Sequence, residues 1–286
     1  MASNPLRYFK PDGNYLTVDI GQFLASSYPA DIPVIVGGGG LIANELFEPV
    51  LRKICLPGDN QQLNEIWKKG WELSDPTNAN VQQEFVTKLQ QLVSETKKKL
   101  VNNRSLRVIW GAGHNSGGWK KKGTAEYPDW IADFDLVGIR DWGQMSKWVP
   151  CASCMSELFD KQYPIKNDII IFEHKKQLIT DWPTKSIPRF VNSGNNFAQT
   201  IELLGSANTV ITNSYHGVYW ATLLGKKVIC HAPWSSKFSY FRHRPYFTLN
   251  WDHLDDALDQ AKPHPGALDE CRTANKQFWD NIKGKL

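Results

Sequence analysis

The sequence lacks the features that would place the chain in a membrane or on a secretory route. No stretch approaches the roughly 18–20 consecutive apolar residues that a helix needs to cross a bilayer. The N-terminal residues Met-Ala-Ser-Asn-Pro contain no basic segment followed by an apolar one, so we expect no secretory signal. Hydrophobic residues make up 41% of the chain and charged residues 22%, which excludes disorder and collagen-like sequence. We therefore expect a folded, cytoplasmic protein without a transmembrane segment.

A concentrated basic surface is also missing. The 33 Lys and Arg residues barely exceed the 29 Asp and Glu residues, which gives a formal net charge of +4. The lysine clusters at 97–99, 120–122 and 226–227 are short and lie far apart in the sequence. Because nucleic-acid binding requires basic side chains gathered in one patch or stripe, we expect no nucleic-acid partner.

The cysteines are few, and their number is odd. The five are Cys55, Cys151, Cys154, Cys230 and Cys271. Cys151 and Cys154 have the C-x-x-C spacing of redox and zinc sites, but a structural zinc requires a second pair, which the sequence lacks. A thioredoxin-like pair is expected near the chain start, whereas this one follows Pro150 in mid-chain. A reduced intracellular protein without a metal site is the simpler interpretation.

The pattern along the 286 residues predicts strands alternating with helices. Short apolar runs that end in glycine or polar residues are typical of parallel strands buried on both faces. Successive strands and helices of this kind imply right-handed crossovers and an α/β fold. Because the length exceeds what one core usually organises, we expect two domains, at 1–150 and 151–265, followed by a C-terminal helix within 266–286 that packs back on the first domain. The predicted strands are 33–36, 106–110, 136–139, 168–172, 190–191, 209–212 and 227–230, and the predicted helices are 81–100, 197–204, 218–224 and 268–282.

Ligands of open α/β sheets bind beyond the carboxyl ends of the strands. Four predicted strands end there in small or polar residues, at 37–40, 111–115, 140–141 and 213–217. Neither glycine run matches the G-x-G-x-x-G dinucleotide fingerprint, and no P-loop is present. The glycines therefore serve either close helix–strand packing or the approach of backbone N–H groups to an anion. The candidate binding residues are Gly38, Gly39, Gly111, Gly113, His114, Asn115, Ser214, Tyr215 and Gly217.

Two residues at these strand ends are candidates for chemistry. His216 lies between a predicted strand and helix, where it either hydrogen-bonds a neighbouring loop or acts as an acid or base. Arg140 either clamps a bound carboxylate or phosphate, or it pairs with Asp141 or with a carboxylate on a helix. A basic cluster at 242–244 contains Arg242 and Arg244, which either close over an acidic ligand or belong to a solvated loop.

Segment 208–229 reads Asn-Thr-Val-Ile-Thr-Asn-Ser-Tyr-His-Gly-Val-Tyr-Trp-Ala-Thr-Leu-Leu-Gly-Lys-Lys-Val-Ile. It resembles the signature of the polysaccharide pyruvyl transferase family, in which a strand leads to a Ser-x-x-His or Ser-Phe-His-Gly turn. A helix with small residues then ends in Leu-Gly-Lys-Pro-Val-Ile. The run at 35–42 resembles the first glycine-rich loop of that family, and 138–141 resembles its Arg-Asp turn. The order and approximate spacing agree from about residue 30 to 235.

This resemblance implies a GT-B-like fold, in which two Rossmann-like domains with parallel sheets face each other across a cleft, the first on the acceptor side and the second on the donor side. It implies transfer of a pyruvyl group from phosphoenolpyruvate to a glycan or lipid-linked sugar, which forms a ketal without a metal or organic cofactor. His216 is then the acid/base residue, and Arg140 binds the phosphate or carboxylate of the donor. Many members carry Arg two positions before the histidine, where this chain has Ser214. The hypothesis is that Arg242 or Arg244 compensates.

Two other functions fit the same features. A glycosyltransferase of this architecture would bind the diphosphate of a nucleotide-sugar in the glycine-rich loops, and His216 would deprotonate the acceptor. A non-catalytic glycan-binding protein would use some of the 12 Trp residues, which stand among 9 Tyr and 13 Phe, to stack on sugar rings. The serine at position 214 favours the binding protein, because it removes one expected anion ligand.

Overall fold

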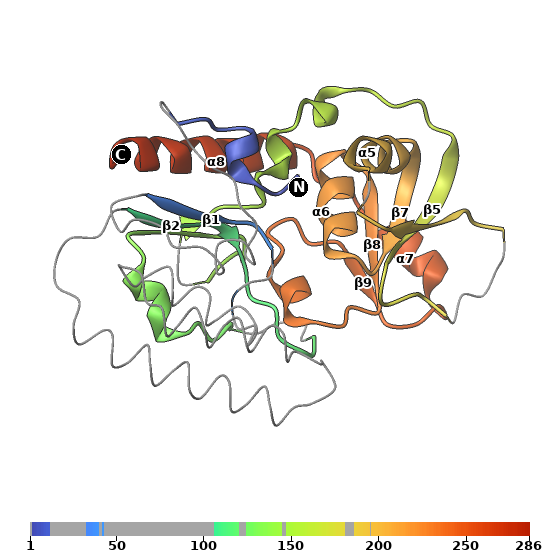
Figure 1. Ribbon diagram of the computed structural model, residues 1–286. Coiled ribbons are helices and arrows are strands. Elements are labelled where there is room, and N and C mark those ends of the chain that lie inside the picture. The colour runs from blue at the N-terminus through green and yellow to red at the C-terminus, as the bar shows by residue number, and fades with distance from the viewer. Residues whose placement is uncertain are drawn as a thin grey trace, which may run out of the picture.

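The fold is known from a computed structural model, which describes residues 2–11, 33–39, 42, 106–119, 124–144, 147–180, 186–194 and 196–286. The helix expected at 81–100, the lysine cluster at 97–99 and Cys55 lie outside these residues. The described chain confirms the α/β class, with two sheets made of parallel strands and helices packed on them (Figure 1).

The first sheet has the strand order β1-β2-β3-β4, and every pair is parallel. All six residues of β2 are buried, as the apolar run predicts for a central strand. Gly111 has a φ of 67°, and the register with β3 shifts at this residue. This irregularity turns the chain toward His114 at the carboxyl edge. The strands are β1 (Val34–Gly37), β2 (Arg107–Ala112), β3 (Leu136–Ile139) and β4 (Lys147–Trp148).

The second sheet has the order β6-β5-β7-β8-β9 and is also entirely parallel. Side chains alternate between its two faces, because successive residues of a strand point in opposite directions. Val210 packs in the core on one face, and Ile211 packs in the core on the other. The strands are β5 (Asn167–His174), β6 (Arg189–Asn192), β7 (Ala207–Thr212), β8 (Lys227–His231) and β9 (Tyr246–Thr248).

Helices cover both faces of this second sheet (Figure 1). The core on one face includes residues of α5 (Phe197–Gly205) and α6 (Tyr215–Leu223), and the core on the other includes residues of α7 (Leu254–Gln260). The described residues also form short 3-10 helices, and none of their helices is long and apolar enough to cross a membrane. These 3-10 helices are η1 (Pro5–Arg7), η2 (Asp129–Asp133), η3 (Ala152–Met155), η4 (Glu157–Asp160) and η5 (Ser236–Tyr240).

The last helix, α8 (Ala267–Lys283), joins the two halves of the fold. Its C-terminal part packs on the first sheet through Phe278 and Ile282, which lie in one core with Val108 and Trp110 (Figure 1). Asn275, which is fully buried, accepts a 2.7 Å hydrogen bond from the Trp110 indole and donates to the Pro150 carbonyl at 3.2 Å. Since these bonds are shielded from water, they hold the helix in one register on the sheet.

The start of α6 differs from the prediction of a helix over 218–224. The helix begins at Tyr215, so His216 and Gly217 lie in its first turn. The Ser214 side chain caps it by accepting a 3.4 Å hydrogen bond from the Gly217 N–H. The prediction was wrong because the glycine was read as part of a turn. Instead, its missing Cβ lets the helix pack against Thr212 and Phe172.

Candidate functional site

The carboxyl ends of the two sheets approach each other at a polar site. Arg140 and Asp141 follow β3 of the first sheet, His216 lies in the first turn of α6 of the second, and Lys237 lies in η5 after β8. The carboxyl ends of parallel strands lie at one edge of their sheet. The site therefore combines side chains from the carboxyl edges of both sheets.

Arg140 is the most unusual residue of the site. It is only 4% exposed, yet its Nε and Nη2 atoms are buried and have no hydrogen-bond partner. Its guanidinium lies over the Tyr215 ring, with Cζ 4.0 Å from the ring centroid. A cation over an aromatic face gains some electrostatic energy, but the ring supplies no acceptor for the two N–H groups. The guanidinium therefore keeps two buried nitrogens without an acceptor.

Gly113 provides the space that Arg140 occupies. A Cβ atom added at this glycine would lie 2.5 Å from Arg140 Nε and 2.7 Å from Asp141 Oδ1. The Gly113 N–H also bonds to the Gly39 carbonyl at 3.1 Å, which ties two of the predicted loops together. The absence of a side chain at Gly113 therefore leaves room for the side chains of Arg140 and Asp141.

Asp141 does not neutralise Arg140 by an ion pair. Its Oδ2 atom accepts hydrogen bonds from the His114 N–H at 2.6 Å and the Tyr127 hydroxyl at 2.8 Å, while its buried Oδ1 atom has no partner. Burial raises the pKa of the Asp141 carboxyl, and the nearby Arg140 charge partly opposes that rise. The alternative in which Arg140 serves as a partner for Asp141 is not supported by this arrangement.

His216 is held as a neutral imidazole. Its ring stacks on Trp220 with centroids 4.7 Å apart, and Nε2 lies 3.8 Å from the Cys151 sulfur. Burial, followed by the positive charges of Arg140 and Lys237, lowers the pKa of His216 to about 3. Without a ligand, His216 is therefore a weak base and is unprotonated near neutral pH. A bound anion that offset the neighbouring positive charges would favour the protonated form.

Lys237 is a part of the site that the sequence analysis missed. Its Nζ atom lies 3.9 Å from the centroid of the Trp234 ring, and the side chain is half-buried. Burial and the Arg140 charge lower the pKa of Lys237 to about 8. The sequence did contain an indication of this. Lys237 follows β8, and this strand ends at the same carboxyl edge of its sheet as the strand that precedes His216.

A seam of hydrogen bonds positions η5 against the first sheet. His114 Nδ1 lies 2.8 Å from the Ser236 hydroxyl, which also accepts a 2.9 Å bond from the Ser116 N–H. The Ser235 hydroxyl donates to Asn115 Oδ1 at 3.3 Å. Two predicted binding residues, His114 and Asn115, therefore join the two halves of the protein and set the position of Lys237.

Several other predicted binding residues make internal contacts. Gly38 and Gly39 have φ values of 74° and 86°, and a Cβ at Gly38 would meet Ser3. A Cβ at Gly111 would meet the Pro150 carbonyl. Ser214 caps α6 and also accepts a 3.0 Å bond from the Asn192 amide. For these glycines, close packing describes the observed contacts better than contact with an anion.

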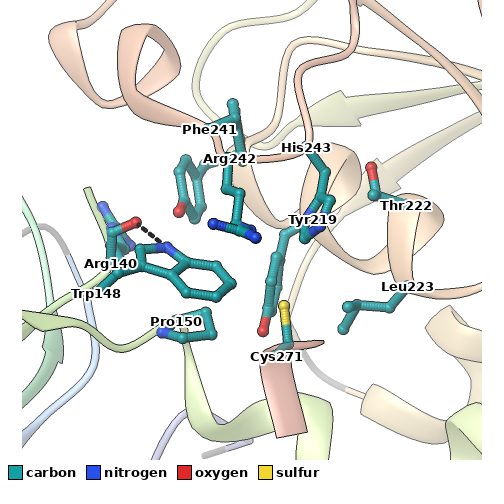
Figure 2. A pocket seen from close by; sticks show the side chains of 11 residues that line it. Arg140, Trp148, Pro150, Tyr219, Thr222, Leu223, Phe241, Arg242, His243 and Cys271 are labelled. Atoms are coloured by element: carbon teal, nitrogen blue, oxygen red, sulfur yellow. Dashed lines mark hydrogen bonds between the residues drawn. The ribbon is translucent and has the colours of Figure 1, made fainter. Parts of the chain in front are cut away.

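Arg242 and Arg244, the arginines suggested to compensate for Ser214, each make contacts of their own. Arg242 Nε bonds to Glu270 of α8 at 2.6 Å, and its guanidinium stacks over the Trp142 ring at 3.9 Å. Arg244 is exposed and lies over Phe247. Arg242 and Arg140 border the same small cavity, where Figure 2 shows the Arg242 guanidinium between Trp148 and Tyr219. In the ligand-free protein the cavity has room for little more than one water molecule, so a larger ligand reaches Arg140 here only if the lining side chains move apart.

The C-x-x-C pair shows none of the features of a reactive thiol. Cys151 and Cys154 are both free and buried, and burial raises the pKa of each thiol. Among the described residues, no group of three or more His, Cys, Asp or Glu side chains is arranged to hold a metal ion. Both cysteines therefore belong to the core beneath α6.

The fold and the site define an α/β protein in which two parallel sheets meet at a basic, partly buried site. Comparisons with protein-family models, with curated proteins and with solved structures returned no match for this chain.

The pKa of His216 makes the stability of the protein depend on pH. Unfolding restores an ordinary histidine pKa of about 6.5, so the unfolded chain binds more protons than the native protein between about pH 3 and 6.5. Stability should therefore fall as the pH drops through this window, by up to about tenfold in the unfolding equilibrium constant per pH unit. We expect His216→Gln to remove this contribution.

Urea unfolding of both proteins at several pH values between 4 and 8 measures the effect. His114, His174 and His243 also have lowered pKa values, so the difference between the two proteins is the informative quantity. Identical pH dependence in the two proteins would show that His216 titrates normally.

Proposed function

We propose that the protein is a transferase of the pyruvyl transferase type, whose site binds the anionic donor phosphoenolpyruvate. The observation that carries this proposal is Arg140, a buried guanidinium with two unpaired nitrogens. An unpaired buried charge costs free energy, and a bound carboxylate or phosphate would offset that cost with two parallel hydrogen bonds. The first turn of α6 lies against Arg140 through Tyr215, and a helix N-terminus favours the same negative charge.

A GT-B-like arrangement belongs to this proposal. The carboxyl edge of the first sheet would hold part of the donor through Arg140, and the second sheet would supply His216. A glycan or lipid-linked sugar would enter from outside, where aromatic side chains such as the half-exposed Trp142 offer a surface for a sugar ring. The resemblance of segments 35–42, 138–141 and 208–229 to the family supports this assignment.

The state of His216 suggests how a bound donor would activate the site. Burial does most to keep the imidazole neutral, and the charges of Arg140 and Lys237 add to it; a phosphate beside Arg140 would offset these charges and would therefore raise the pKa of His216. The imidazolium could then protonate the methylene carbon of the donor while a sugar hydroxyl attacks the adjacent carbon. Loss of phosphate and attack by a second hydroxyl would complete the ketal, and the two hydroxyl protons end on the methyl group and the phosphate.

Thermal unfolding with added ligands tests the donor. Phosphoenolpyruvate should raise the melting temperature, whereas UDP- and GDP-sugars should leave it unchanged. Incubation with phosphoenolpyruvate and a panel of nitrophenyl hexosides, followed by mass spectrometry, should show a gain of one dehydrated pyruvate. A shift produced only by nucleotide-sugars would replace this proposal with glycosyl transfer. A shift produced only by sugars, with no turnover of any donor, would indicate a glycan-binding protein.

A further inference from the structure

We propose that Cys151 is a positioning residue of this site, whose thiol donates a hydrogen bond to His216 Nε2 and thereby keeps the hydrogen of the neutral ring on Nδ1. The assignment gives a role to the first cysteine of the C-x-x-C motif, which forms no metal site with other described residues. It rests on the proposed function only for the reaction that His216 performs, because the position of the ring hydrogen can be measured without a donor.

The imidazole of His216 is held from two directions. Trp220, one helical turn later in α6, stacks on it with ring centroids 4.7 Å apart and an interplanar angle of 24°. Cys151 Sγ lies 3.8 Å from His216 Nε2, which is within hydrogen-bonding distance for sulfur. The other ring nitrogen, Nδ1, makes no hydrogen bond to another residue of the described chain. The ring is therefore fixed through Nε2, and Nδ1 remains available.

The neighbouring hydrogen bonds have directions that point the thiol hydrogen toward the imidazole. An indole N–H can only donate, and Trp220 Nε1 lies 3.0 Å from the Ser153 hydroxyl, which must therefore accept. The hydrogen of that hydroxyl is then available for Cys151 Sγ, 3.2 Å away. A thiol whose sulfur accepts from Ser153 can donate its own hydrogen to His216 Nε2. The indole that stacks on the imidazole is thus linked back to it through Ser153 and Cys151.

Both partners of the Cys151–His216 contact are neutral. Burial raises the pKa of the Cys151 thiol, and burial also does most to lower the pKa of His216 to about 3. This is the opposite of the thiolate and imidazolium that an activated cysteine nucleophile requires. A neutral imidazole has one donor and one acceptor nitrogen, so a hydrogen bond accepted at Nε2 puts the ring hydrogen on Nδ1.

Bonds from two helices fix the position of Cys151. The Tyr219 hydroxyl of α6 donates to its carbonyl at 2.8 Å, and Asn275 of α8 donates to the carbonyl of the preceding residue, Pro150, at 3.2 Å. Cys151 is only 1% exposed and Ser153 is fully buried, so water does not compete for their hydrogen bonds. The thiol therefore has a fixed position relative to α6, and it can hold His216 in one orientation.

A thiol suits this position because it can both donate and accept. When His216 gains a proton, the new hydrogen forms at Nε2 and donates to the sulfur, so the contact persists in both charge states. The Nδ1–H group of the imidazolium is then the one that protonates the methylene carbon in the proposed reaction. The ring is left as the neutral Nε2–H form, still bonded to the sulfur, and proton exchange with water restores the resting form.

Nitrogen NMR of the ligand-free protein, labelled at its histidine rings, tests the assignment near neutral pH. The signals of His216 are those missing from His216→Gln. We expect the wild type to carry the ring hydrogen on Nδ1, although a free histidine side chain prefers the Nε2–H form. Cys151→Ala should reverse this to Nε2–H, because it removes the donor. Cys151→Ser should keep the Nδ1–H form, since a hydroxyl also donates and accepts.

Cys154→Ala is the matched control from the same motif. Its thiol is also buried, but the sulfur contacts the Asn275 amide at 3.4 Å and makes no hydrogen bond to His216. This variant should leave the ring hydrogen of His216 on Nδ1. Circular dichroism and thermal unfolding of each variant check that it folds.

Turnover of phosphoenolpyruvate with the nitrophenyl hexosides measures the consequence for the reaction. We expect the kcat of Cys151→Ala to fall at least about tenfold while KM changes less than about threefold, because a misplaced proton affects the chemical step and not binding. The kcat values of Cys151→Ser and Cys154→Ala should stay within about threefold of the wild-type value.

A ring hydrogen on Nε2 in the wild type would overturn the assignment, since His216 would then donate to the sulfur. An unchanged ring in Cys151→Ala, or an equal change in Cys154→Ala, would also overturn it. The wild-type spectrum decides even if Cys151→Ala does not fold. The proposed function fails in a different way. If the wild type turns over no donor while its ring hydrogen depends on Cys151 as expected, the reaction is wrong and the positioning assignment stands.

Discussion

Replacing Arg140 by methionine should abolish donor binding and transfer without destabilising the ligand-free protein. Methionine fills a volume similar to that of the arginine stem, and it removes a buried charge whose Nε and Nη2 atoms have no partner. Replacing buried charges by apolar residues of similar size is often neutral or stabilising, by about 1–4 kcal/mol for an ion pair. The loss of an anion ligand in a buried site costs about 2–5 kcal/mol, so binding should weaken by at least about thirtyfold.

Thermal unfolding and calorimetric binding of phosphoenolpyruvate measure these two effects on the same samples. Arg244→Met is the control, since this arginine is exposed and lies in the same loop as Arg242. It should leave the affinity for phosphoenolpyruvate unchanged. A variant Arg140→Met that loses several degrees of melting temperature and still binds the donor would show that Arg140 stabilises the fold instead of holding a ligand.

The second large effect is expected for Gly113→Ala. The added methyl group would lie 2.5 Å from Arg140 Nε, 2.7 Å from Arg140 Cγ and 2.7 Å from Asp141 Oδ1, so both side chains must move. Such overpacking costs about 1–3 kcal/mol of stability. The displaced guanidinium can no longer keep its place on Tyr215, and we expect donor affinity to fall by at least about tenfold.

Gly117→Ala is a matched control four positions later in the same loop. A Cβ at Gly117 meets nothing within 4 Å, and its φ does not lie in the left-handed region. This variant should keep wild-type affinity and stability, as measured by the same calorimetry and urea unfolding. Equal losses for both glycines would mean that flexibility of the loop, rather than the space beside Arg140, is what binding requires.

These predictions share one physical cause. The site combines a buried arginine with two nitrogens that lack a hydrogen-bond partner, a half-buried lysine, and a histidine kept neutral by burial and by both of these charges. In the ligand-free protein each feature costs free energy, and a bound anion would offset all three. Groups with perturbed pKa values gathered at one strand edge are typical of functional sites.

Much of the fold follows from local patterns. The apolar runs at 106–110, 168–172 and 209–212 lie in strands of the sheets, because strands buried on both faces require such runs. The helix predicted at 268–282 is observed as Ala267–Lys283, one residue longer at each end. The predicted start of α6 was wrong by three residues. In the sequence, a glycine in the first turn of a helix cannot be told from a glycine in a loop until its packing partners are known.

The sequence by itself determined the chemistry available at the strand ends, because the end of each strand can be read from its apolar pattern. It placed Arg140 after one strand and His216 after another. Only the tertiary structure decided how these groups interact. Whether Arg140 pairs with Asp141, whether Arg242 is free, and whether Lys237 approaches His216 depend on which segments of the two halves face each other. Such contacts join residues far apart in the chain, and their energies depend on burial, which no local pattern of residues specifies.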